Sequence, residues 1–280
     1  DGELFAYQVT PTGVSASPAW KASEGIDDAG DRNIFTLNAD TGSGVAFRWD
    51  ALATTQQDLL GDEATLDYLR GEQSGEIANG GTLRNRAKVL GDIVHSSPYY
   101  VKDTDTVYIG ANDGMLHAFN ANDGVELFAY IPGMLYDKLA DLADPGYTHK
   151  FYMDGEIAVS PRSLTPSQNI LVATPGRGAR GLFALDVTNP GDFDENDVLW
   201  ELSGASDNDM GLILGRPQIG KLQNGETVAV VGNGYNSPNG SAVLYVIALD
   251  DGEVLARLDT QKSGGNGMAT PLLWDAMNGN

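Results

Sequence analysis

The sequence is poor in cysteine, histidine and basic residues. Its 280 residues include no cysteine, 3 histidines, and 17 Lys and Arg against 39 Asp and Glu. The lack of cysteine excludes a disulfide framework and thiolate chemistry, and a chain of this length buries enough apolar surface to fold without such cross-links. The formal net charge of −22 repels phosphate groups, so nucleic-acid binding is not expected.

Long apolar runs are absent as well. A membrane-spanning helix needs about 20 consecutive apolar residues, and we predict no membrane span because no segment reaches that length. The first residues, Asp1 to Phe5, lack the basic start and apolar stretch of a secretion signal and look like the middle of a β-hairpin. We therefore expect the sequence to be a piece of a longer protein.

Internal repetition is the most informative feature that is present. Each repeated unit has an apolar strand, a turn, a second apolar strand that ends near Asn or Asp, a glycine-containing turn and a third strand. These units cover residues 107–130, 170–200 and 228–255. A short strand with a proline precedes each unit, and a fourth such strand follows the last one; the prolines are Pro98, Pro161, Pro217 and Pro271. Four strands per unit predict the blades of a β-propeller.

Two partial units, near residues 4–20 and 34–49, precede the three complete ones, which makes about five blades and the opening strand of another. We therefore predict an all-β fold in which residues 1–280 form a single propeller domain that is incomplete at both ends. Two segments break the β pattern. Residues 51–88 are predicted to form a helical and loop insertion, and residues 134–145 a short helical insertion.

One segment points to a known family. The sequence Gly91-Asp92-Ile93-Val94-His95-Ser96-Ser97-Pro98, followed by Tyr108 to Phe119, resembles the C-terminal domain of the PilY/PilC-type pilus-tip adhesins. The likeness covers nearly the whole chain and continues in residues 44–49, 128–132, 151–155 and 232–237. This resemblance implies a modified, quinoprotein-like propeller with seven blades in the intact domain, of which the chain is a truncated part.

The same resemblance implies a function without catalysis. Members of this family support type IV pilus biogenesis and extension, adhere to surfaces and are controlled by calcium. By this resemblance we expect a secreted protein at the pilus tip or cell surface of a Gram-negative bacterium, with the outer membrane or periplasm as further locations. The implied partners are type IV pilus components, in particular minor pilins, and a host or abiotic surface.

Two acidic loops are candidates for a calcium site, because calcium prefers about six to eight oxygen ligands from closely spaced Asp, Asn and carbonyl groups. In the first loop, Asp192, Asp194 and Asn196 alternate as they do at the start of an EF-type loop. The glycine and the glutamate that complete such a loop are missing, since Asp197 and Ser203 occupy those positions. A solvated acidic turn between strands is the competing interpretation.

The second candidate loop follows the apolar residues 271–274, at the point where the family carries its calcium loop. The resemblance carries over to Asp275, Asn278 and Asn280, while Met277 occupies a position at which a ligand would be expected. The remaining ligands would lie beyond residue 280. An Asn/Gly turn that leads into the next strand is the competing interpretation.

Two further functions remain open from the sequence. Ala118, Asn120, Gly124 and Phe128 follow the spacing of the Ala-x-Asp-x-x-x-Gly-x-x-x-Trp motif of PQQ-type quinoprotein dehydrogenases, with Asn and Phe substituted. In those enzymes the motif docks one blade onto the next, so it reports the fold rather than catalysis. The other possibility is a periplasmic scaffold for outer-membrane assembly, which is also a propeller without catalysis.

No catalytic or zinc-binding residues are predicted. The histidines, His95, His117 and His149, lack the close spacing of zinc ligands, and His117 is expected to be a half-buried hydrogen-bonding residue in a strand. Ser96 and Ser97 lie beside His95 but lack the Gly-x-Ser-x-Gly turn that exposes a nucleophile.

Two basic motifs also have simple interpretations. Arg84, Arg86 and Lys88 form a small basic island, and we expect nearby acidic residues to balance it. The tripeptide that begins at Arg70 reads Arg-Gly-Glu, so it lacks the Asp of the Arg-Gly-Asp integrin tripeptide found in some relatives.

Overall fold

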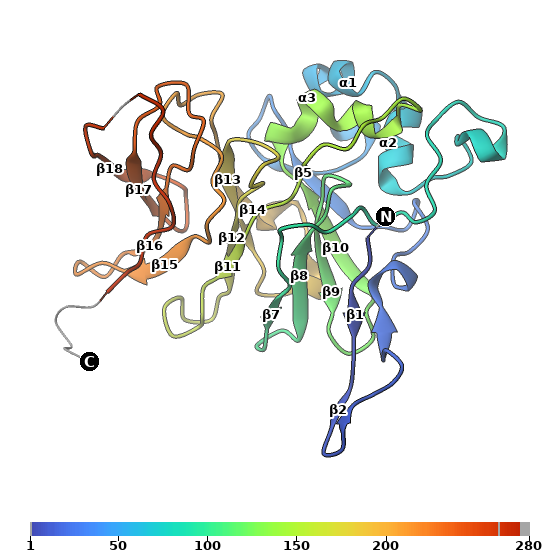
Figure 1. Cartoon of the computed structure of the whole chain (residues 1–280), viewed down its shortest axis with the longest axis horizontal. Helices are drawn as coiled ribbons and strands as arrows, with labels where there is room; N and C mark the ends of the chain where they lie inside the picture. Colours follow the sequence, from blue (N-terminus) through green and yellow to red (C-terminus); the bar gives the residue numbers. More distant parts are fainter. Residues whose placement is uncertain (1, 263, 275–280) are drawn as a thin grey trace. The chain divides into compact units, whose positions relative to one another are not determined.

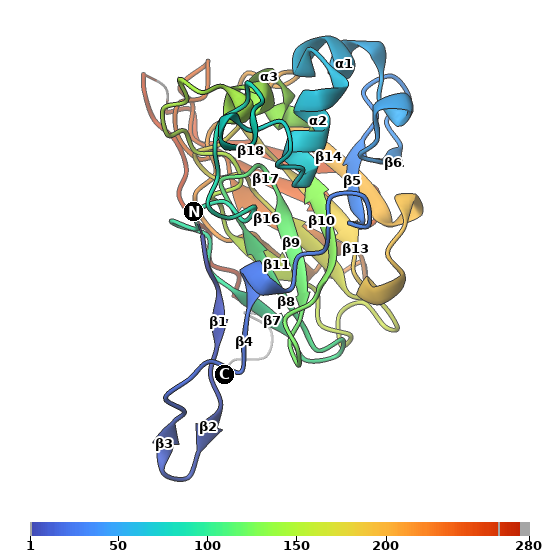
Figure 2. The same cartoon turned by 90° about the vertical axis from the view of Figure 1, so that its right-hand side faces the viewer.

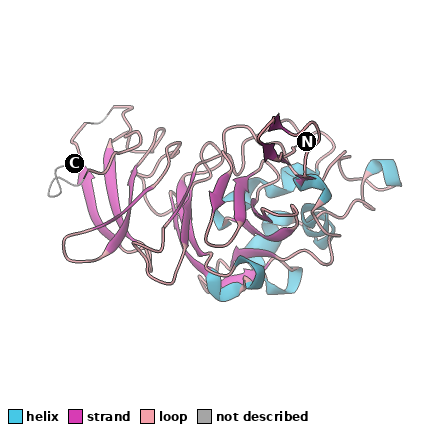
Figure 3. Cartoon of the chain, turned by 90° about the horizontal axis from the view of Figure 1, so that it is seen from below, coloured by secondary structure: helices cyan, strands magenta, loops and turns pink. Residues whose placement is uncertain are grey.

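The computed structural model describes residues 2–262 and 264–274, and the chain forms two compact units (Figure 1). Unit 1 consists of residues 1–154 and 189–198, and unit 2 of residues 155–188 and 199–280. Strands dominate both units, and every helix among the described residues belongs to unit 1 (Figure 3). No helix in the described ranges is long and apolar enough to cross a bilayer.

Unit 1 is built on a six-stranded sheet with the order β6-β5-β10-β9-β8-β7. Its strands are β5 (Ile34–Leu37), β6 (Gly44–Ala46), β7 (Tyr99–Val101), β8 (Thr106–Gly110), β9 (Leu116–Asn120) and β10 (Glu126–Ile131). Strands β7 to β10 form an antiparallel meander, and β5 adds to it in parallel with β10. The sequence predicted a separate partial blade at residues 34–49; instead these strands extend the sheet of the first complete repeat, because the edge of β10 pairs with β5.

A two-stranded ribbon precedes this sheet. Strand β1 (Phe5–Ala6) pairs with β4 (Trp20–Lys21), and the chain between them forms a second hairpin from β2 (Val9–Thr10) and β3 (Gly13–Val14). The ribbon extends away from the rest of unit 1 in both Figure 1 and Figure 2. It is followed by the one-turn helix η1 (Ala22–Glu24).

The helices of unit 1 lie mainly within residues 51–88 and 133–143. They are η2 (Trp49–Ala51), α1 (Thr54–Leu60), α2 (Glu63–Arg70), η3 (Ile77–Asn79), η4 (Gly133–Leu135), α3 (Tyr136–Leu139) and η5 (Ala140–Ala143), with η6 (Pro190–Asp192) and η7 (Glu195–Asp197) further along the chain. Asp62 caps α2, since its carboxylate accepts a hydrogen bond from the Thr65 amide at 2.8 Å. Gly71 ends the same helix at a φ of +121°. Leu66 and Leu69 bury the apolar face of α2.

Unit 2 contains two four-stranded antiparallel meanders. The first has β11 (Ile157–Val159), β12 (Ile170–Ala173), β13 (Gly181–Asp186) and β14 (Val198–Ser203), and the second has β15 (Gln218–Lys221), β16 (Thr227–Gly232), β17 (Val243–Ala248) and β18 (Val254–Asp259). The three predicted repeats therefore form the last three strands of three meanders. The core of unit 2 is apolar and includes Ile170, Val172, Leu182, Trp200, Val231, Tyr245 and Ile247. That the whole chain is part of one seven-bladed ring stays a prediction.

A tryptophan docks in the same way in both units. In unit 1, Trp20 Nε1 donates to the carbonyl three residues before Gly124 (2.8 Å), and in unit 2 Trp200 Nε1 donates to the carbonyl three residues before Gly252 (3.0 Å). A Cβ on either glycine would lie 2.7 Å from the indole ring. Both glycines have positive φ, which suits the turn, and their missing side chain leaves room for the ring. Gly124, which belongs to the quinoprotein-like spacing of residues 118–128, thus acts here in packing.

Candidate functional site

The segment that carries the family resemblance is tied to residues 149–154 by side-chain hydrogen bonds. Asp92 Oδ2 accepts from His149 Nε2 at 2.8 Å and from Asn112 Nδ2 at 3.1 Å. Asn112 Oδ1 in turn accepts from the backbone amide of Tyr152 at 2.8 Å. Because Asn112 is buried and uses both ends of its amide, it joins the loop at residue 92 to the next part of the chain.

His95 is held at the other end of this segment. Its Nδ1 lies 2.7 Å from Asp154 Oδ2, and its backbone amide donates to Asp154 Oδ1 at 3.0 Å. The Asp154 carboxylate is buried, whereas about half of the His95 side chain is exposed. Ser96 is buried and its hydroxyl accepts from the Gly110 amide at 2.9 Å. These contacts position a loop, and they do not form the serine–histidine pair that a nucleophile requires.

A buried ionic cluster lies inside the sheet of unit 1. His117 in β9 is fully buried, with Nδ1 2.7 Å from Glu126 Oε1 and Nε2 3.1 Å from Asp113 Oδ2. Arg32 donates to both Glu126 oxygens, at 2.7 and 2.8 Å. The sequence predicted a half-buried histidine with a hydrogen-bonding role. The structure shows complete burial between two carboxylates, because Arg32 from a distant segment balances the second one.

The electrostatics of this cluster follow from burial and close charges. Burial opposes the charged form of His117, but the carboxylates of Asp113 and Glu126 outweigh it and raise the histidine pKa to about 9. Burial also opposes the Glu126 anion, but Arg32 and His117 lower the pKa of this carboxyl to about 2. The cluster is therefore fully charged at neutral pH, with two cations facing two anions. Three of its four members are buried, and Asp113 is the member that reaches a small surface pocket.

Arg70 is also buried and cannot serve as a recognition residue. Its guanidinium donates to the carbonyls of Phe47 (3.0 Å), Ala29 (2.7 Å) and Arg32 (2.8 Å), and the residue is 1% exposed. Burial, together with the charges of nearby arginines, lowers its pKa to about 10. The Arg-Gly-Glu tripeptide that begins here therefore cannot present its cation to a receptor.

The basic island is largely neutralised by its neighbours. Arg86 Nε forms an ion pair with Glu76 at 2.9 Å, and its guanidinium lies 3.5 Å from the centroid of the Tyr68 ring. Lys88 Nζ pairs with a carboxylate near the N-terminus at 2.8 Å. Arg84 donates to a backbone carbonyl of η5 and lies over the ring of Tyr147. This arrangement agrees with a role in charge balance and aromatic packing.

The first predicted calcium loop is a capped turn in the structure. Asp194 accepts from the backbone amide and side-chain amide of Asn196, at 2.8 and 3.1 Å, and Asp197 accepts from the Asp194 amide at 2.9 Å. Between these polar residues, Phe193 is buried and stacks on Phe128 with ring centroids 3.8 Å apart. The carboxylates are thus used in capping η7.

Among residues 2–262 and 264–274, no group of three or more His, Asp or Glu side chains is placed to hold a metal ion. Asp192, Asp194 and Asn196 could supply only part of a calcium shell, with backbone carbonyls and water completing it. The second predicted loop, with Asp275, Asn278 and Asn280, lies outside the described residues. Both calcium assignments stay predictions.

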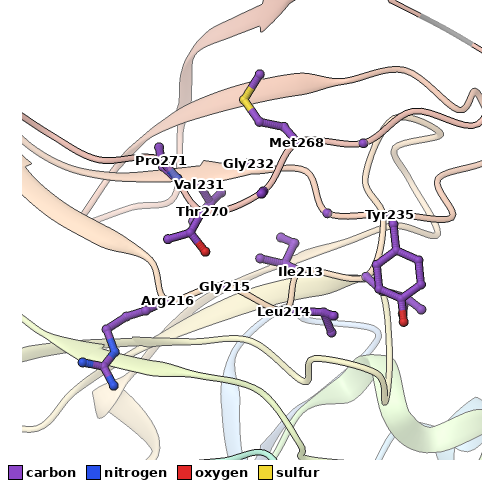
Figure 4. A pocket seen from close by; sticks show the side chains of 14 residues that line it. Ile213, Leu214, Gly215, Arg216, Val231, Gly232, Tyr235, Met268, Thr270 and Pro271 are labelled. Atoms are coloured by element: carbon purple, nitrogen blue, oxygen red, sulfur yellow. The ribbon is translucent and has the colours of Figure 1, made fainter.

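An apolar cavity of about 340 Å³ lies in unit 2, between residues 212–216 and residues 267–271. Figure 4 shows the side chains of Ile213 and Met268 on its wall, with Arg216 and Tyr235 toward opposite ends. Arg216 is ion-paired with Glu156 at 2.9 Å. Among the described residues that line the cavity, Arg216 and Tyr235 are the titratable ones and most of the others are apolar, so this wall suits an apolar group.

Sequence reasoning did not single out this cavity, although glycines mark it. A Cβ on Gly215 would lie 1.7 Å from Thr270 Oγ1, so only glycine allows the two wall segments to approach. The amide of Gly234 donates to the Met268 carbonyl at 3.0 Å, and Asn233 Oδ1 accepts from the Met268 amide at 2.9 Å. Asn233 therefore makes the same contact in unit 2 that Asn112 makes in unit 1.

Comparison with known proteins identifies the family. A sequence profile described as the PilY1 beta-propeller domain matches residues 90–279. The type IV pilus biogenesis factor PilY1 of Pseudomonas aeruginosa is 34% identical over 98% of this chain, and a PilY1 homologue of Xylella fastidiosa is 30% identical over 93%. The chain spans only 27% and 22% of the length of these two relatives.

A crystal structure of the Pseudomonas aeruginosa PilY1 C-terminal domain is 33% identical to this chain, covers 61% of it and superimposes with a TM-score of 0.49 over 34% of the crystallised chain. The sequence matches extend over most of the chain, and its strand-rich fold agrees with them. The chain belongs to the PilY1 beta-propeller domain family.

Proposed function

We propose that this chain is the propeller part of a pilus-tip-associated protein that supports type IV pilus biogenesis and extension and adheres to surfaces. The observation that carries the proposal is the identity of 34% to a PilY1 biogenesis factor over 98% of the chain. The described sites agree with a role in binding rather than catalysis. The histidines are paired with carboxylates that position loops or lie in the interior, and the cavity in unit 2 is apolar.

The proposed binding surfaces are the loops between strands, which packed sheets hold in place. The proposed partners are pilus components, in particular minor pilins, together with a host or abiotic surface. Such partners require the protein to be secreted and exposed outside the cytoplasm.

Deletion and complementation in the producing bacterium test this function. Loss of the full-length protein should reduce the number of surface pili and the attachment of cells, and the wild-type gene should restore both. A parallel assay of purified protein for PQQ-dependent dye reduction addresses the dehydrogenase alternative. Normal piliation and attachment without the protein, or dye reduction that requires it, would contradict the proposal.

We further propose that calcium regulates the protein through Asp275, Asn278 and Asn280, with Asp192, Asp194 and Asn196 as a second candidate set. Closely spaced oxygen ligands support this assignment. Calorimetry on the full-length protein should show heat of binding and a higher melting temperature in millimolar calcium, and Asp275→Ala should remove both. The double variant Asp192→Ala/Asp194→Ala is the matched comparison, because it tests the other loop. No calcium-dependent heat in the wild-type protein would refute calcium control without affecting the assignment to the pilus.

A further inference from the structure

A small pocket opens on the surface of unit 1 beside the basic island. Its volume is about 50 Å³, and its lining residues come from the end of α2, from residues 84–92, from the β8–β9 turn, and from Leu142 and Tyr147. Each water-sized atom occupies about 10–15 Å³ of such a volume, so the space holds about three to five of them. The pocket can therefore take the polar end of a small molecule but is too small for an aromatic ring.

Tyr68 lines this pocket and brings an unsatisfied hydroxyl group to it. The residue is 1% exposed, yet its hydroxyl forms no hydrogen bond of normal geometry with any part of the chain that the structure describes. Burial raises the pKa of this phenol, although the nearby cations Arg86 and Arg84 oppose the shift, so the group keeps its proton and can donate at neutral pH. Since buried polar groups are normally hydrogen-bonded, this donor calls for an acceptor in the pocket.

Arg84 supplies further donors at the same place. Its Nε donates to the Leu142 carbonyl at 2.6 Å, and its guanidinium lies 4.6 Å from the centroid of the Tyr147 ring. Its two terminal nitrogens make no hydrogen bond or ion pair with the described residues. Arg86 and Lys88 also line the pocket, but each is already paired with a carboxylate. The positive charge that is left for a ligand is therefore that of Arg84.

Asp92 contributes an acceptor to the lining. Its Oδ2 accepts hydrogen bonds from His149 and Asn112, whereas its Oδ1 accepts none within the described ranges, and its side chain is 34% exposed. Both oxygens of Asp113, the other acidic lining residue, are already used by backbone amides and by His117. The pocket thus combines donors without acceptors, at Tyr68 and Arg84, with an acceptor that still has a free oxygen.

We propose that this pocket binds a small zwitterion, of the class of a free α-amino acid with a short side chain. Its carboxylate accepts hydrogen bonds from the Tyr68 hydroxyl and the Arg84 guanidinium, which are strong because the acceptor is charged. Its ammonium group donates to Oδ1 of Asp92. A zwitterion has no net charge, so a protein with a net charge of −22 does not repel it, whereas the same protein repels a simple anion.

The rest of the lining sets the size of this ligand. Leu69, Leu90 and Leu142 are buried and also line the pocket, so they can contact a methylene or methyl group but offer no further polar partner from their side chains. Glycine and alanine match this combination of a small apolar part and two charged ends. A larger side chain would have to extend into solvent.

Calorimetric titration of the full-length protein with glycine tests the proposal. A molecule of this size should bind with a dissociation constant on the order of 1 mM. Tyr68→Phe removes only the hydroxyl and should weaken binding at least about tenfold, because a hydrogen bond to a charged group is lost. The matched control is Tyr108→Phe, since the Tyr108 hydroxyl is also buried without a partner in the described chain but does not line the pocket. Melting temperatures verify that both variants are folded.

Titrations with acetate and with methylammonium separate the two charged ends of the ligand. Each carries one of the two groups, so each should bind at least about tenfold more weakly than glycine. Acetate that binds as tightly as glycine would overturn the zwitterion assignment, because the carboxylate alone would then be recognised. Equal affinities of the Tyr68→Phe and Tyr108→Phe variants for glycine, or no heat with glycine or alanine in the wild-type protein, would overturn the site itself.

Discussion

Equivalent strands of the two units hold different chemistry at the same position. His117 in β9 and Tyr245 in β17 each lie seven residues before the glycine on which a tryptophan docks, and both are fully buried. His117 is enclosed between two carboxylates in the interior. The longer Tyr245 instead reaches outward, and its hydroxyl donates to Asp207 at 2.7 Å. The same scaffold therefore places ions in the core of unit 1 and keeps them near the surface of unit 2.

This difference predicts how strongly the stability of each unit depends on its ion pairs. In unit 2, Arg257 pairs with Asp207 at 2.5 Å and also with Asp209, in a partly exposed position where solvent screens the charges. In unit 1, Arg32 and Glu126 are nearly inaccessible, so removing one of them leaves the other charged and without its counter-ion. The stability of unit 1 therefore depends on the buried Arg32–Glu126 ion pair, whereas the partly exposed ion pairs of Arg257 should contribute little to the stability of unit 2.

Glu126→Gln should have the largest effect on stability. The substitution keeps the size of the side chain but removes the negative charge that faces Arg32 and His117, and breaking a buried ion pair on one side costs about 3–5 kcal/mol. Chemical denaturation followed by circular dichroism measures the loss. Tyr245→Phe is the control from unit 2, where loss of one hydrogen bond should cost about 1 kcal/mol. Similar losses for the two variants would show that the cores do not differ as described.

The stability of the protein should depend on pH through the buried ionic cluster of unit 1. Because the pKa of His117 is raised to about 9 in the folded state from 6.5, its contribution is fully present below pH 6.5 and is lost as the pH rises through 9. The pKa of Glu126 is lowered to about 2, so its contribution is present above pH 4.5 and is lost as the pH falls toward 2.

Melting temperatures measured between pH 6 and pH 10 test the histidine part of this prediction. Across this range the wild-type protein should lose on the order of 3 kcal/mol of stability as His117 loses its proton. The variant His117→Gln should be less stable at pH 6, and its melting temperature should fall less steeply with pH. A slope that is unchanged in the variant would assign the pH dependence to other groups.

Substitution of the glycine beneath each tryptophan should destabilise the two units by similar amounts, and by less than Glu126→Gln does. Gly252→Ala adds a Cβ that meets the Trp200 ring and also strains a residue with φ of +76°, so we expect a loss of about 2–3 kcal/mol. Gly124→Ala should match it, because Trp20 covers that glycine in the same way.

Gly225→Ala is the control for backbone strain. Gly225 has a φ of +92° and nothing within 4 Å of its added Cβ, so it should cost only about 1 kcal/mol. Thermal denaturation of the three variants provides the comparison. If Gly225→Ala is as destabilising as the other two, strain alone accounts for the effect and the indole contact contributes little.

Much of the fold could be predicted from local patterns. The repeated strand pattern marked three meanders, and the glycine turns at Gly124 and Gly252 marked where the last two strands meet in the first and third of them. Strand β5 was harder to place, since an apolar run such as Ile34–Leu37 fits a separate blade as well as an added strand. Which neighbour such a strand pairs with depends on which sheet edge is free, and composition does not contain that information.

The candidate site was less predictable for the same reason. The spacing in Asp192 to Asp197 predicted either a calcium loop or an acidic turn, and the hydrogen-bond partners of its carboxylates depend on the local backbone. Residues 4–20 were predicted as a partial blade unit, whereas their pairing into a ribbon with an inner hairpin and the exposure of Val9 required the three-dimensional arrangement. Likewise, the glycines that line the cavity in unit 2 were visible in the sequence, but the close approach of residues 215 and 270 was not.

The sequence by itself determined the alternation of strands and turns, the acidic charge and the family, because these depend on residue order and composition alone. Only the tertiary structure decided that His117 is a fully buried cation, since the chain brings Arg32 and Glu126 together across 94 positions of sequence. It also decided that Arg70 is inaccessible and that the face around Val9 is open. Burial and pairing are properties of the packed chain, and they set the charge and reactivity of each side chain.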